Sequence, residues 1–326
     1  FVQMSSAFDE LKVVALAGGV GGAKLVFGLD RILPAGNLSV IVNTGDDFEH
    51  FGLKICPDLD TVCYTLANMA DPKHGWGLMD ESYAVSKNLA ALNAPTWFTL
   101  GDRDLATHME RTRLLNLGWK LSEVTAHFCK LWRINSHIIP MSEMAAPTML
   151  NTKLEGTLSF QEYFVKHQCQ PDVLSISYEH NSNATASESA LRALEEADLV
   201  VICPSNPLLS IAPILSFKEI ERLVRLKKVI AVSPIIQGKA LKGPAAKLYK
   251  ELGFEVSSKS VLKTYQSIVD LFVYDELDSE EFKNFAFKDI IIRDAQTIMK
   301  NDSEKIQLAN TILKLGKTML GQAENG

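Results

Sequence analysis

A doubly wound α/β protein, with a mainly parallel sheet and a mostly helical insertion, is the fold class that this sequence predicts. Three observations lead to it. Short apolar runs alternate with segments of helical periodicity, as in parallel sheets whose strands are buried on both faces. A glycine-rich turn joins the first apolar run to the first helical segment, and residues 61–149 are rich in helix formers but poor in strand-like runs. We therefore expect a single domain over residues 1–326.

The apolar runs define the expected strands, and the segments between them define the expected helices. Strands are expected at residues 12–17, 39–43, 197–203, 228–233 and 271–274. Helices are expected at residues 23–32, 59–69, 81–92, 187–196, 217–226, 245–252 and 302–320. The α/β core then covers about residues 12–60 and 150–285. The helical insertion, at about residues 61–149, lies over the carboxyl edge of the sheet, and the last helix packs on the core.

Composition and charge exclude several classes of partner. The formal net charge is −6, and the absence of a broad basic field argues against a nucleic-acid partner. The five cysteines lack CxxC spacing and indicate reduced thiols in a cytoplasmic protein. The seven histidines form no HExxH pattern, which argues against zinc. The uncharged stretch 199–217 contains Pro204, Pro207 and Pro213, so we expect a buried strand with a ligand loop and no membrane contact.

The turn after the first strand has the composition of a phosphate-binding turn. It reads Gly18, Gly19, Val20, Gly21, Gly22, Ala23, Lys24. Glycines between a strand and a helix expose backbone N–H groups to an anion at the helix N-terminus. It is not a Walker A loop, and Lys24 stands where a dinucleotide fingerprint has its third glycine. The alternative is a tight turn that allows close packing of the helix on the strand.

Acidic residues follow the second strand and begin the next helix. Asp46 and Asp47 end the segment VNTGDD, and Asp58 and Asp60 lie in PDLDT. Carboxylate oxygens at the carboxyl edge of an α/β sheet are typical of a Mg²⁺ site or of contacts to ribose hydroxyls. The alternatives are an exposed turn for the first pair, and for the second an N-cap at Asp58 with Asp60 facing the helix dipole.

A third cluster combines charged and hydroxyl groups in the segment TLGDRDLATH. Arg103 has the geometry for a bidentate contact with a phosphate or carboxylate. Asp102 or Asp104 could orient that arginine or accept a hydroxyl proton, and His108 could act in acid–base chemistry. Thr99 stands at the apolar entry to the segment. The alternative is a salt-bridged helix cap with a structural histidine.

Two loops in the second half follow consecutive expected strands. The first contains Ser205 and Asn206 between prolines, and the second contains Gly238, Lys242 and Gly243 in the segment SPIIQGKALKGPAAK. Both loops are expected at the sheet edge that carries the glycine-rich turn. Hydroxyl, amide and ammonium groups there suit a base, a ribose or a phosphate. The alternative is a pair of rigid surface turns with solvated lysines.

Together these motifs resemble those of the 2-phospho-L-lactate transferase family, which includes bacterial members with a phosphoenolpyruvyl donor. The resemblance rests on GGVGGAK, VNTGDD, PDLDT, GWG, LGDRDLATH, PSNP and SPIIQGKALKGPAAK, and it extends from about residue 12 to 320. It implies a Rossmann-like fold, a phosphotransferase for substituted phosphate groups, a role in coenzyme F420 biosynthesis, dependence on Mg²⁺ and a homodimer.

The resemblance also implies a reaction. A guanosine diphosphate-linked donor passes 2-phospholactate or phosphoenolpyruvate to the ribityl hydroxyl of the deazaflavin Fo (7,8-didemethyl-8-hydroxy-5-deazariboflavin). GMP leaves, and F420-0 or dehydro-F420-0 forms. The motifs do not distinguish these acids from 3-phosphoglycerate, although the Val-Gly-Gly and Gly-Asp-Asp details are more typical of the bacterial members.

Residue by residue, the resemblance implies the following roles. The turn at residues 18–24 lies near the diphosphate, and Asp46, Asp47 and Asp60 are associated with the metal. Asp60, Thr99 and Arg103 face Fo, while Ser205, Asn206 and residues 238–247 contact the guanine nucleotide. Phosphoryl transfer requires positioning and charge neutralisation, which Mg²⁺ on Asp47 and Asp60 would provide together with Arg103. Asp60 or Asp102 is the expected general base.

Two other classes of protein share parts of this pattern. A non-catalytic nucleotide- or nucleotide-sugar-binding regulator of a related family would keep the glycine-rich core, but the intact PDLDT and LGDRDLATH segments argue against it. A nicotinamide-dependent dehydrogenase would use the turn and Asp46, but the third glycine is missing and several acids stand near the phosphate position.

Overall fold

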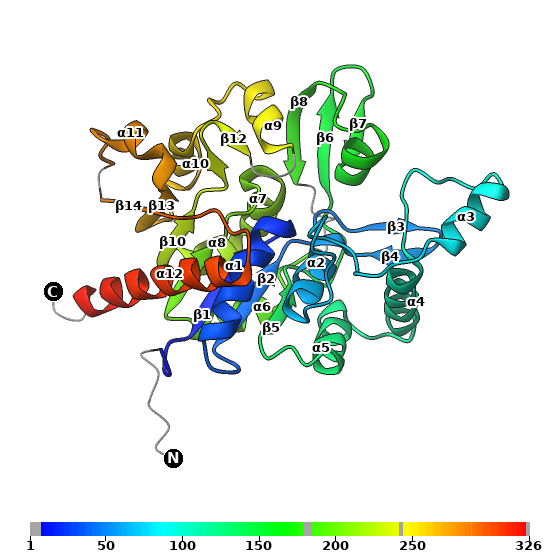
Figure 1. Ribbon diagram of the computed structural model, residues 1–326, viewed down its shortest axis with the longest axis horizontal. Coiled ribbons are helices and arrows are strands. Elements are labelled where there is room, and N and C mark those ends of the chain that lie inside the picture. Colours follow the sequence, from blue (N-terminus) through cyan, green and yellow to red (C-terminus); the bar gives the residue numbers. More distant parts are fainter. Residues whose placement is uncertain (1–7, 179–183, 241–243, 288, 324–326) are drawn as a thin grey trace, which may run out of the picture.

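The central sheet of the computed structural model has seven parallel strands, and the structure describes residues 8–178, 184–240, 244–287 and 289–323. The strand order is β14-β13-β10-β9-β1-β2-β5 (Figure 1). From β1 the chain builds the sheet in one direction through β2 and β5, and in the other through β9, β10, β13 and β14, which is the order of a Rossmann-like fold. The prediction of a doubly wound α/β protein is therefore confirmed. The strand bounds are β1 Val13–Ala17, β2 Leu38–Val42, β5 His137–Pro140, β9 Leu199–Ile202, β10 Lys228–Val232, β13 Leu271–Asp275 and β14 Ile291–Ala295.

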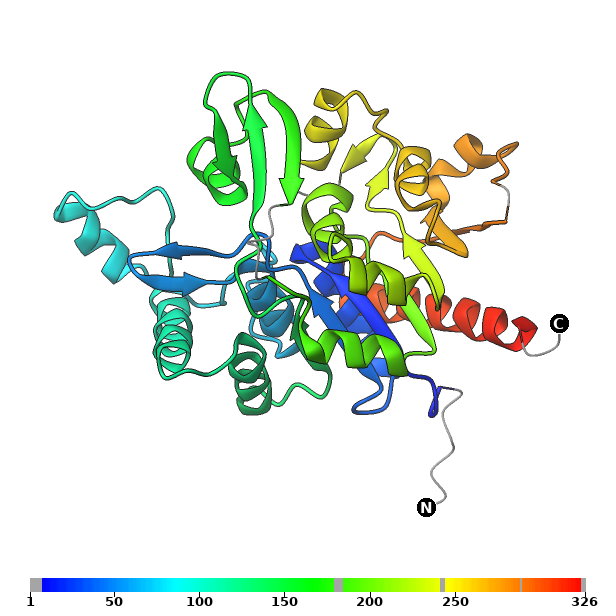
Figure 2. The ribbon, with the colours of Figure 1, turned by 180° about the vertical axis from the view of Figure 1, so that it is seen from behind.

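Helices cover both faces of this sheet because its central strands are apolar on both sides. Side chains of β1 alternate between two cores: Val13 and Ala15 join one cluster, and Val14 and Leu16 join the other. The first face is covered by α1 (Gly19–Ile32), α2 (Pro57–Leu66) and α12 (Asp302–Ala323). The opposite face, turned toward the viewer in Figure 2, is covered by α6 (Glu188–Glu196), α7 (Ala212–Leu215), α8 (Lys218–Val224) and α10 (Ser258–Tyr265).

Smaller units surround the carboxyl edge of the sheet. One, which we call the arm, extends from the body in Figure 1 and consists of the hairpin β3 (Phe48–His50) and β4 (Leu53–Ile55) with α3 (Ala84–Ala91) and α4 (Asp102–Asn116). Helix α5 (Leu121–Leu131) leads from α4 back to β5. A second unit is an antiparallel sheet of three strands with the π-helical turn η1. Its bounds are β6 Thr148–Thr152, β7 Thr157–Ser159, η1 Glu162–Lys166 and β8 Val173–Tyr178.

The remaining elements lie in the second half of the chain. The hairpin β11 (Ile235–Ile236) and β12 (Lys239–Ala240) precedes α9 (Ala245–Glu251). A second π-helical turn, η2 (Pro207–Ile211), follows β9, and the short helices η3 (Glu276–Asp278) and α11 (Ser279–Phe282) follow β13. Within the described ranges, no helix combines the length and the apolar character needed to cross a membrane.

The structure differs from the expected organisation at three places. Segment 61–149 supplies α3, α4 and α5 but also β5, which forms one edge of the central sheet. The segment after residue 285 supplies β14, the other edge, and residues 148–178 form the separate three-stranded sheet. Edge strands are short or half exposed: β5 has four residues, and most side chains of β14 are exposed. Neither therefore shows the continuous apolar run that marks a buried strand.

The C-terminal helix α12 packs closely on α1, and Gly28 makes that approach possible. A Cβ added at Gly28 would lie 2.1 Å from the carbonyl oxygen of Lys305 and 2.8 Å from Cβ of Ala309. We predict that Gly28→Ala lowers the free energy of unfolding by about 1–3 kcal/mol, because the two helices must separate. Urea denaturation measures the change.

The matched control for that variant is Gly321→Ala in α12. A Cβ at this position meets nothing within 4 Å. Its expected effect is a gain of up to about 1 kcal/mol, from the higher helix propensity of alanine. If Gly28→Ala and Gly321→Ala changed stability equally, the close packing of α1 on α12 would be contradicted.

Candidate active site

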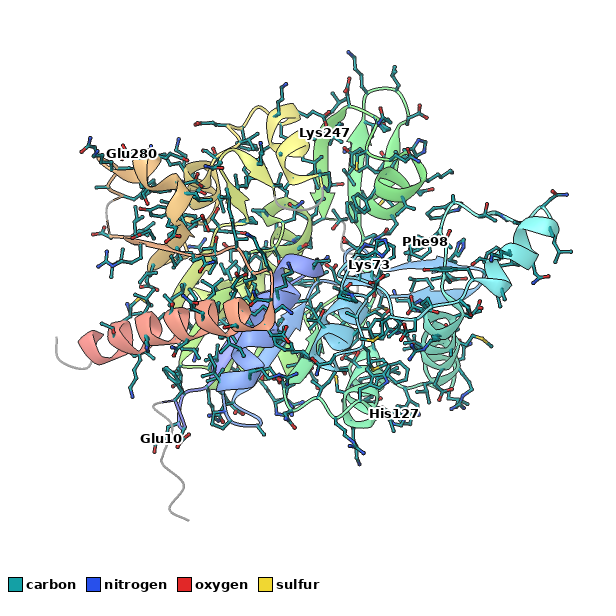
Figure 3. All side chains as sticks on the ribbon, viewed as in Figure 1. Glu10, Lys73, Phe98, His127, Lys247 and Glu280 are labelled. Carbon is teal, nitrogen blue, oxygen red and sulfur yellow. The ribbon has the colours of Figure 1, made fainter. Side chains whose placement is uncertain are left out.

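A cavity of about 880 Å³ opens at the carboxyl ends of β1, β2 and β9. This is the point at which the strand order reverses, and open α/β sheets bind their ligands there. Its walls come from the starts of α1 and α2, the loop after β9, the arm, the three-stranded sheet and residues 297–299. Figure 3 labels two lining residues, Lys73 and Phe98, where the arm meets the body.

The glycine-rich turn forms the inner end of this cavity and begins α1. Gly18 is extended, and the helix starts at Gly19, four residues earlier than expected. The hydroxyl of Ser205 accepts the N–H of Gly18 at 3.0 Å and donates to the carbonyl of Gly18 at 2.8 Å. A Cβ at Gly21 would lie 2.3 Å from the carbonyl oxygen of Pro204, and one at Gly22 equally close to Ser205 Oγ. The glycines therefore bring α1 against the loop that follows β9.

Of the seven residues of this turn, all but Gly22 and Ala23 line the cavity. Gly18, Gly19, Gly21 and Lys24 face it. The ammonium of Lys24 donates to the carbonyl of Met299 at 2.8 Å. The first turn of α1 itself holds no acidic residue, and although the N–H of Gly19 bonds to Asp58, the helix dipole adds positive potential at this N-terminus. This end of the cavity suits a phosphate group.

Two buried carboxylates, Asp46 and Asp58, line the cavity beside the turn. Asp58 accepts hydrogen bonds from Asn43 Nδ2 at 2.9 Å and from the N–H of Gly19. Burial raises the pKa of Asp58 to about 6 although the Asn43 bond opposes it. Burial and the charge of Asp58 raise the pKa of Asp46 well above its ordinary value. Among the described residues nothing bonds to Asp46 Oδ1, and no lysine, arginine or histidine side chain acts on either carboxylate.

The other two candidate metal ligands already have cationic partners. Asp47 does not line the cavity, and its Oδ2 lies 3.2 Å from Nζ of Lys54. Asp60 lines the cavity, but both of its oxygens contact the buried guanidinium of Arg111, with Nη1 to Oδ2 at 3.1 Å. Burial works against the charge of Arg111, yet Asp60 outweighs it and raises the pKa of the arginine. Asp47 and Asp60 thus differ from Asp46 and Asp58, on which no cationic side chain in the described ranges acts.

The Asp60–Arg111 pair continues into a polar network on α4. His108 Nδ1 lies 3.1 Å from Arg111 Nη1, and His108 Nε2 lies 3.3 Å from Asp104 Oδ2. The hydroxyl of Tyr64 donates to Asp104 at 2.6 Å. Burial opposes ionisation of Asp104, but His108 and Tyr64 outweigh it and lower the pKa of this carboxyl. Asp60, Asp104 and His108 lie close enough to hold a metal ion, but Arg111 already neutralises the Asp60 carboxylate.

Asp102 and Arg103, for which catalytic roles were expected, are not among the residues that line the cavity. Asp102 accepts the N–H groups of Ala84 and Val85 and so caps α3. The Ser82 hydroxyl and these N–H groups lower the pKa of Asp102. Arg103 is exposed and donates to the carbonyl of Met79. Helical spacing explains the difference, because positions 104, 108 and 111 share the face of α4 that packs inward, whereas positions 102 and 103 do not.

The remaining sequence-derived candidates fall into three groups. Thr99, Ser205 and Asn206 line the cavity, and the Asn206 side chain accepts the N–H groups of Leu208 and Leu209. Gly238 does not line it and forms the turn of the β11–β12 hairpin at a φ of +67°. Lys242 and Gly243 lie outside the described residues.

Aromatic side chains form the outer end of the cavity. Trp76 comes from the segment between α2 and α3, and Trp97 and Phe98 come from the segment between α3 and α4. Phe160 follows β7, and Phe164 lies in η1. Phe98 also packs edge-on against Phe48 with ring centroids 4.8 Å apart. The cavity thus has a polar inner end and an aromatic outer end. The first suits phosphate groups, and the second suits a planar aromatic group.

Comparison with known proteins adds a family and a fold. Residues 13–315 match the family model described as 2-phospho-L-lactate transferase CofD. The 2-phospho-L-lactate transferase of Methanosarcina acetivorans is 39% identical over 309 residues, which cover 94% of this chain and 100% of the relative. That of Methanocaldococcus jannaschii is 37% identical, covering 93% and 97%. The phosphoenolpyruvate transferase of Streptomyces griseus is 35% identical, covering 94% and 99%.

Solved structures support the fold alone. A UPF0052 family protein from Bacillus halodurans superposes with a TM-score of 0.63 at 11% identity, covering 95% of this chain and 100% of that protein. At this identity the likeness says nothing about shared chemistry.

Arg111 is predicted to be essential for stability because it neutralises a buried carboxylate. Arg111→Gln removes both guanidinium contacts of Asp60 and leaves, of the basic side chains that the structure describes, only His108, with Nδ1 at 3.7 Å from Oδ2. It should lower the free energy of unfolding by about 3–5 kcal/mol. Adding Asp60→Asn should recover part of this loss. On the same helix, Arg113→Gln breaks an exposed pair with Glu110, and its cost should stay below about 1 kcal/mol. Similar losses for the two arginine variants in urea denaturation would contradict the assignment.

Proposed function

The chain belongs to the 2-phospho-L-lactate transferase family, and we propose that it transfers a phospho-three-carbon-acid unit to Fo in the biosynthesis of coenzyme F420. The proposed donor is guanosine diphosphate-linked 2-phospholactate or phosphoenolpyruvate. The acceptor is the ribityl hydroxyl of Fo, and GMP is the leaving product. The names of the relatives, 2-phospho-L-lactate transferase and phosphoenolpyruvate transferase, support these two acids. The expected homodimer stays a prediction.

One observation carries this proposal: a single cavity joins the glycine-rich start of α1 to an aromatic outer end. A nucleoside diphosphate derivative needs backbone N–H groups and positive charge for its phosphates. A deazaflavin needs a flat apolar surface for its ring system. Both requirements are met within one cavity, so the donor and the acceptor can bind next to each other. Such positioning is the main way in which a protein catalyses phosphoryl transfer.

The residues of this chain fit a bound Mg²⁺. Asp46 has a buried oxygen without a hydrogen-bond partner among the described residues, and Asp58 stands beside it. We propose that these two carboxylates hold the ion, since Mg²⁺ prefers carboxylate oxygens. When bound, it would neutralise charge on the transferred phosphate.

Positioning of the acceptor falls to the network on α4. We propose Asp104 as the group that accepts the proton of the ribityl hydroxyl. Asp104 lines the cavity, and His108 and Tyr64 hold its pKa below the ordinary value, so its carboxylate is ionised at neutral pH. Asp60 is held by Arg111 and acts in this proposal as the anchor of the network.

The proposal is tested by incubating the protein with Fo, Mg²⁺ and, separately, guanylylated 2-phospholactate, phosphoenolpyruvate and 3-phosphoglycerate. We expect a phosphodiester-linked deazaflavin and GMP with at least one donor, detected by mass spectrometry. Asp104→Asn should lower kcat by about 10²–10⁴-fold, the usual range for loss of a general base. Asp102→Asn should lower kcat far less, because Asp102 caps α3 outside the cavity. GDP binding without product from any donor would favour the non-catalytic regulator.

The proposed Mg²⁺ site should depend on pH. The folded-state pKa of Asp58, about 6, lies above its ordinary value of 3.8. Its contribution to stability is therefore present at low pH and is lost as the pH rises through 6. Because Mg²⁺ competes with the proton, the rise in Tm caused by Mg²⁺ should be larger at pH 7.5 than at pH 5.

Two variants locate that effect. Asp58→Asn should abolish the Mg²⁺-dependent rise in Tm at both pH values. Asp47→Asn should retain it, because Asp47 pairs with Lys54 and does not line the cavity. A Mg²⁺ effect lost in Asp47→Asn and kept in Asp58→Asn would overturn the assignment of the two ligands.

A further inference from the structure

One amide side chain in the cavity wall has no hydrogen-bond partner within the described ranges of the chain. The side chain of Gln161 lines the cavity, the residue is 6% exposed, and its amide makes no hydrogen bond to the described residues. Its amide atoms are not among the fully buried atoms that lack a partner, so the amide faces the open volume of the cavity, where a ligand can satisfy its donor and its acceptor. Asn206 is another amide in the lining, and its oxygen by contrast already accepts two backbone N–H groups. Gln161 is therefore available to a ligand.

The segment around Gln161 is held rigidly by its other side chains. Ser159 donates its N–H and its hydroxyl to Glu162 Oε2, at 3.1 and 2.9 Å. Tyr163 is fully buried and accepts a hydrogen bond from Lys247 on α9 at 3.2 Å. The N–H of His167 donates to the carbonyl of Glu162, which closes the π-helical turn η1. Single π-helical turns occur often at functional sites.

An aromatic surface stands three residues further along the same turn. Phe164 lines the cavity and is 39% exposed. Its ring stacks on that of the buried Phe160, with centroids 5.3 Å apart and planes 19° apart, which fixes its orientation. The ring of Phe164 is thus exposed on one face and supported on the other by Phe160. Together with the amide of Gln161 it can recognise a flat heterocycle, because the ring stacks on the heterocycle and the amide bonds to its edge.

We propose that Gln161 and Phe164 recognise a planar nitrogen heterocycle through its lactam edge. The glutamine oxygen accepts the ring N–H, the glutamine NH₂ donates to the adjacent ring carbonyl, and the ring stacks on Phe164. The identity of the ligand rests on the proposed function, because both proposed substrates carry this edge. It is N1–H with C6=O in the guanine of the donor, and N3–H with its flanking carbonyls in the deazaflavin.

The test measures binding by calorimetry rather than turnover. GDP and Fo are titrated separately into wild type, Gln161→Leu and Phe164→Leu. We expect one of the two ligands to lose at least 10-fold in affinity in both variants, consistent with loss of an edge contact or a stacking contact. Gln170→Leu, an exposed position in the same segment and outside the cavity lining, should bind both ligands like wild type. Phe164→Leu changes an exposed side chain and should fold normally. It therefore still tests the inference if Gln161→Leu folds poorly.

Altered ligands identify the edge itself. Inosine diphosphate keeps the lactam and adenosine diphosphate lacks it, while N3-methylation removes the ring N–H of Fo. Wild type should discriminate within one of these sets, and Gln161→Leu should lose that discrimination. Three results would each overturn the inference. They are equal affinities in wild type and Gln161→Leu, an affinity loss in Gln161→Leu that is the same for ligands with and without the lactam, and no binding of GDP and Fo to wild type. Lack of product with lactam discrimination intact would instead refute only the proposed function.

Discussion

The hydroxyl of Ser205 joins the two halves of the sheet where β1 ends. It bonds to both the N–H and the carbonyl of Gly18, and the loop after β9 thereby lies directly against the start of α1. These bonds are buried, where the loss of either partner leaves an unsatisfied backbone group. The start of α1 in turn holds Asp58, whose carboxylate accepts the N–H of Gly19. The arrangement of the residues at the polar end of the cavity therefore depends on the hydrogen bonds between Ser205 and Gly18.

Much of the fold could be predicted because central parallel strands are buried on both faces. The expected strands at 12–17, 39–43, 197–203, 228–233 and 271–274 correspond to β1, β2, β9, β10 and β13. The edge strands β5 and β14 could not be found in this way. Each pairs with only one other strand and is less covered by the core, so its sequence does not need a continuous apolar run. The three-stranded sheet was missed for a related reason, since its side chains serve a small core of their own.

The candidate site was predictable where chemistry and strand ends coincide. Asp46 and Ser205 directly follow strands, and their positions in the cavity lining follow from the topology. Asp58 looked like an ordinary helix cap, and only the fold turns its carboxylate toward Asp46. Arg111 and Asp104 share a helix face with His108, a spacing that could have indicated a polar network. Gln161 had no local signal at all, because its lack of a partner is a property of tertiary packing.

The pairing of α1 with α12 links the beginning of the chain to its end. Helix α1 follows the first strand of the sheet, yet the helix that covers it is formed by residues 302–323. During synthesis on the ribosome, the face of α1 that packs on α12 must therefore stay uncovered until residues 302–323 have been made. Contacts between such distant segments close late and slow folding. Helix α1 is therefore covered on this face only after α12 has been made, and chains that stop before residue 302 should expose it.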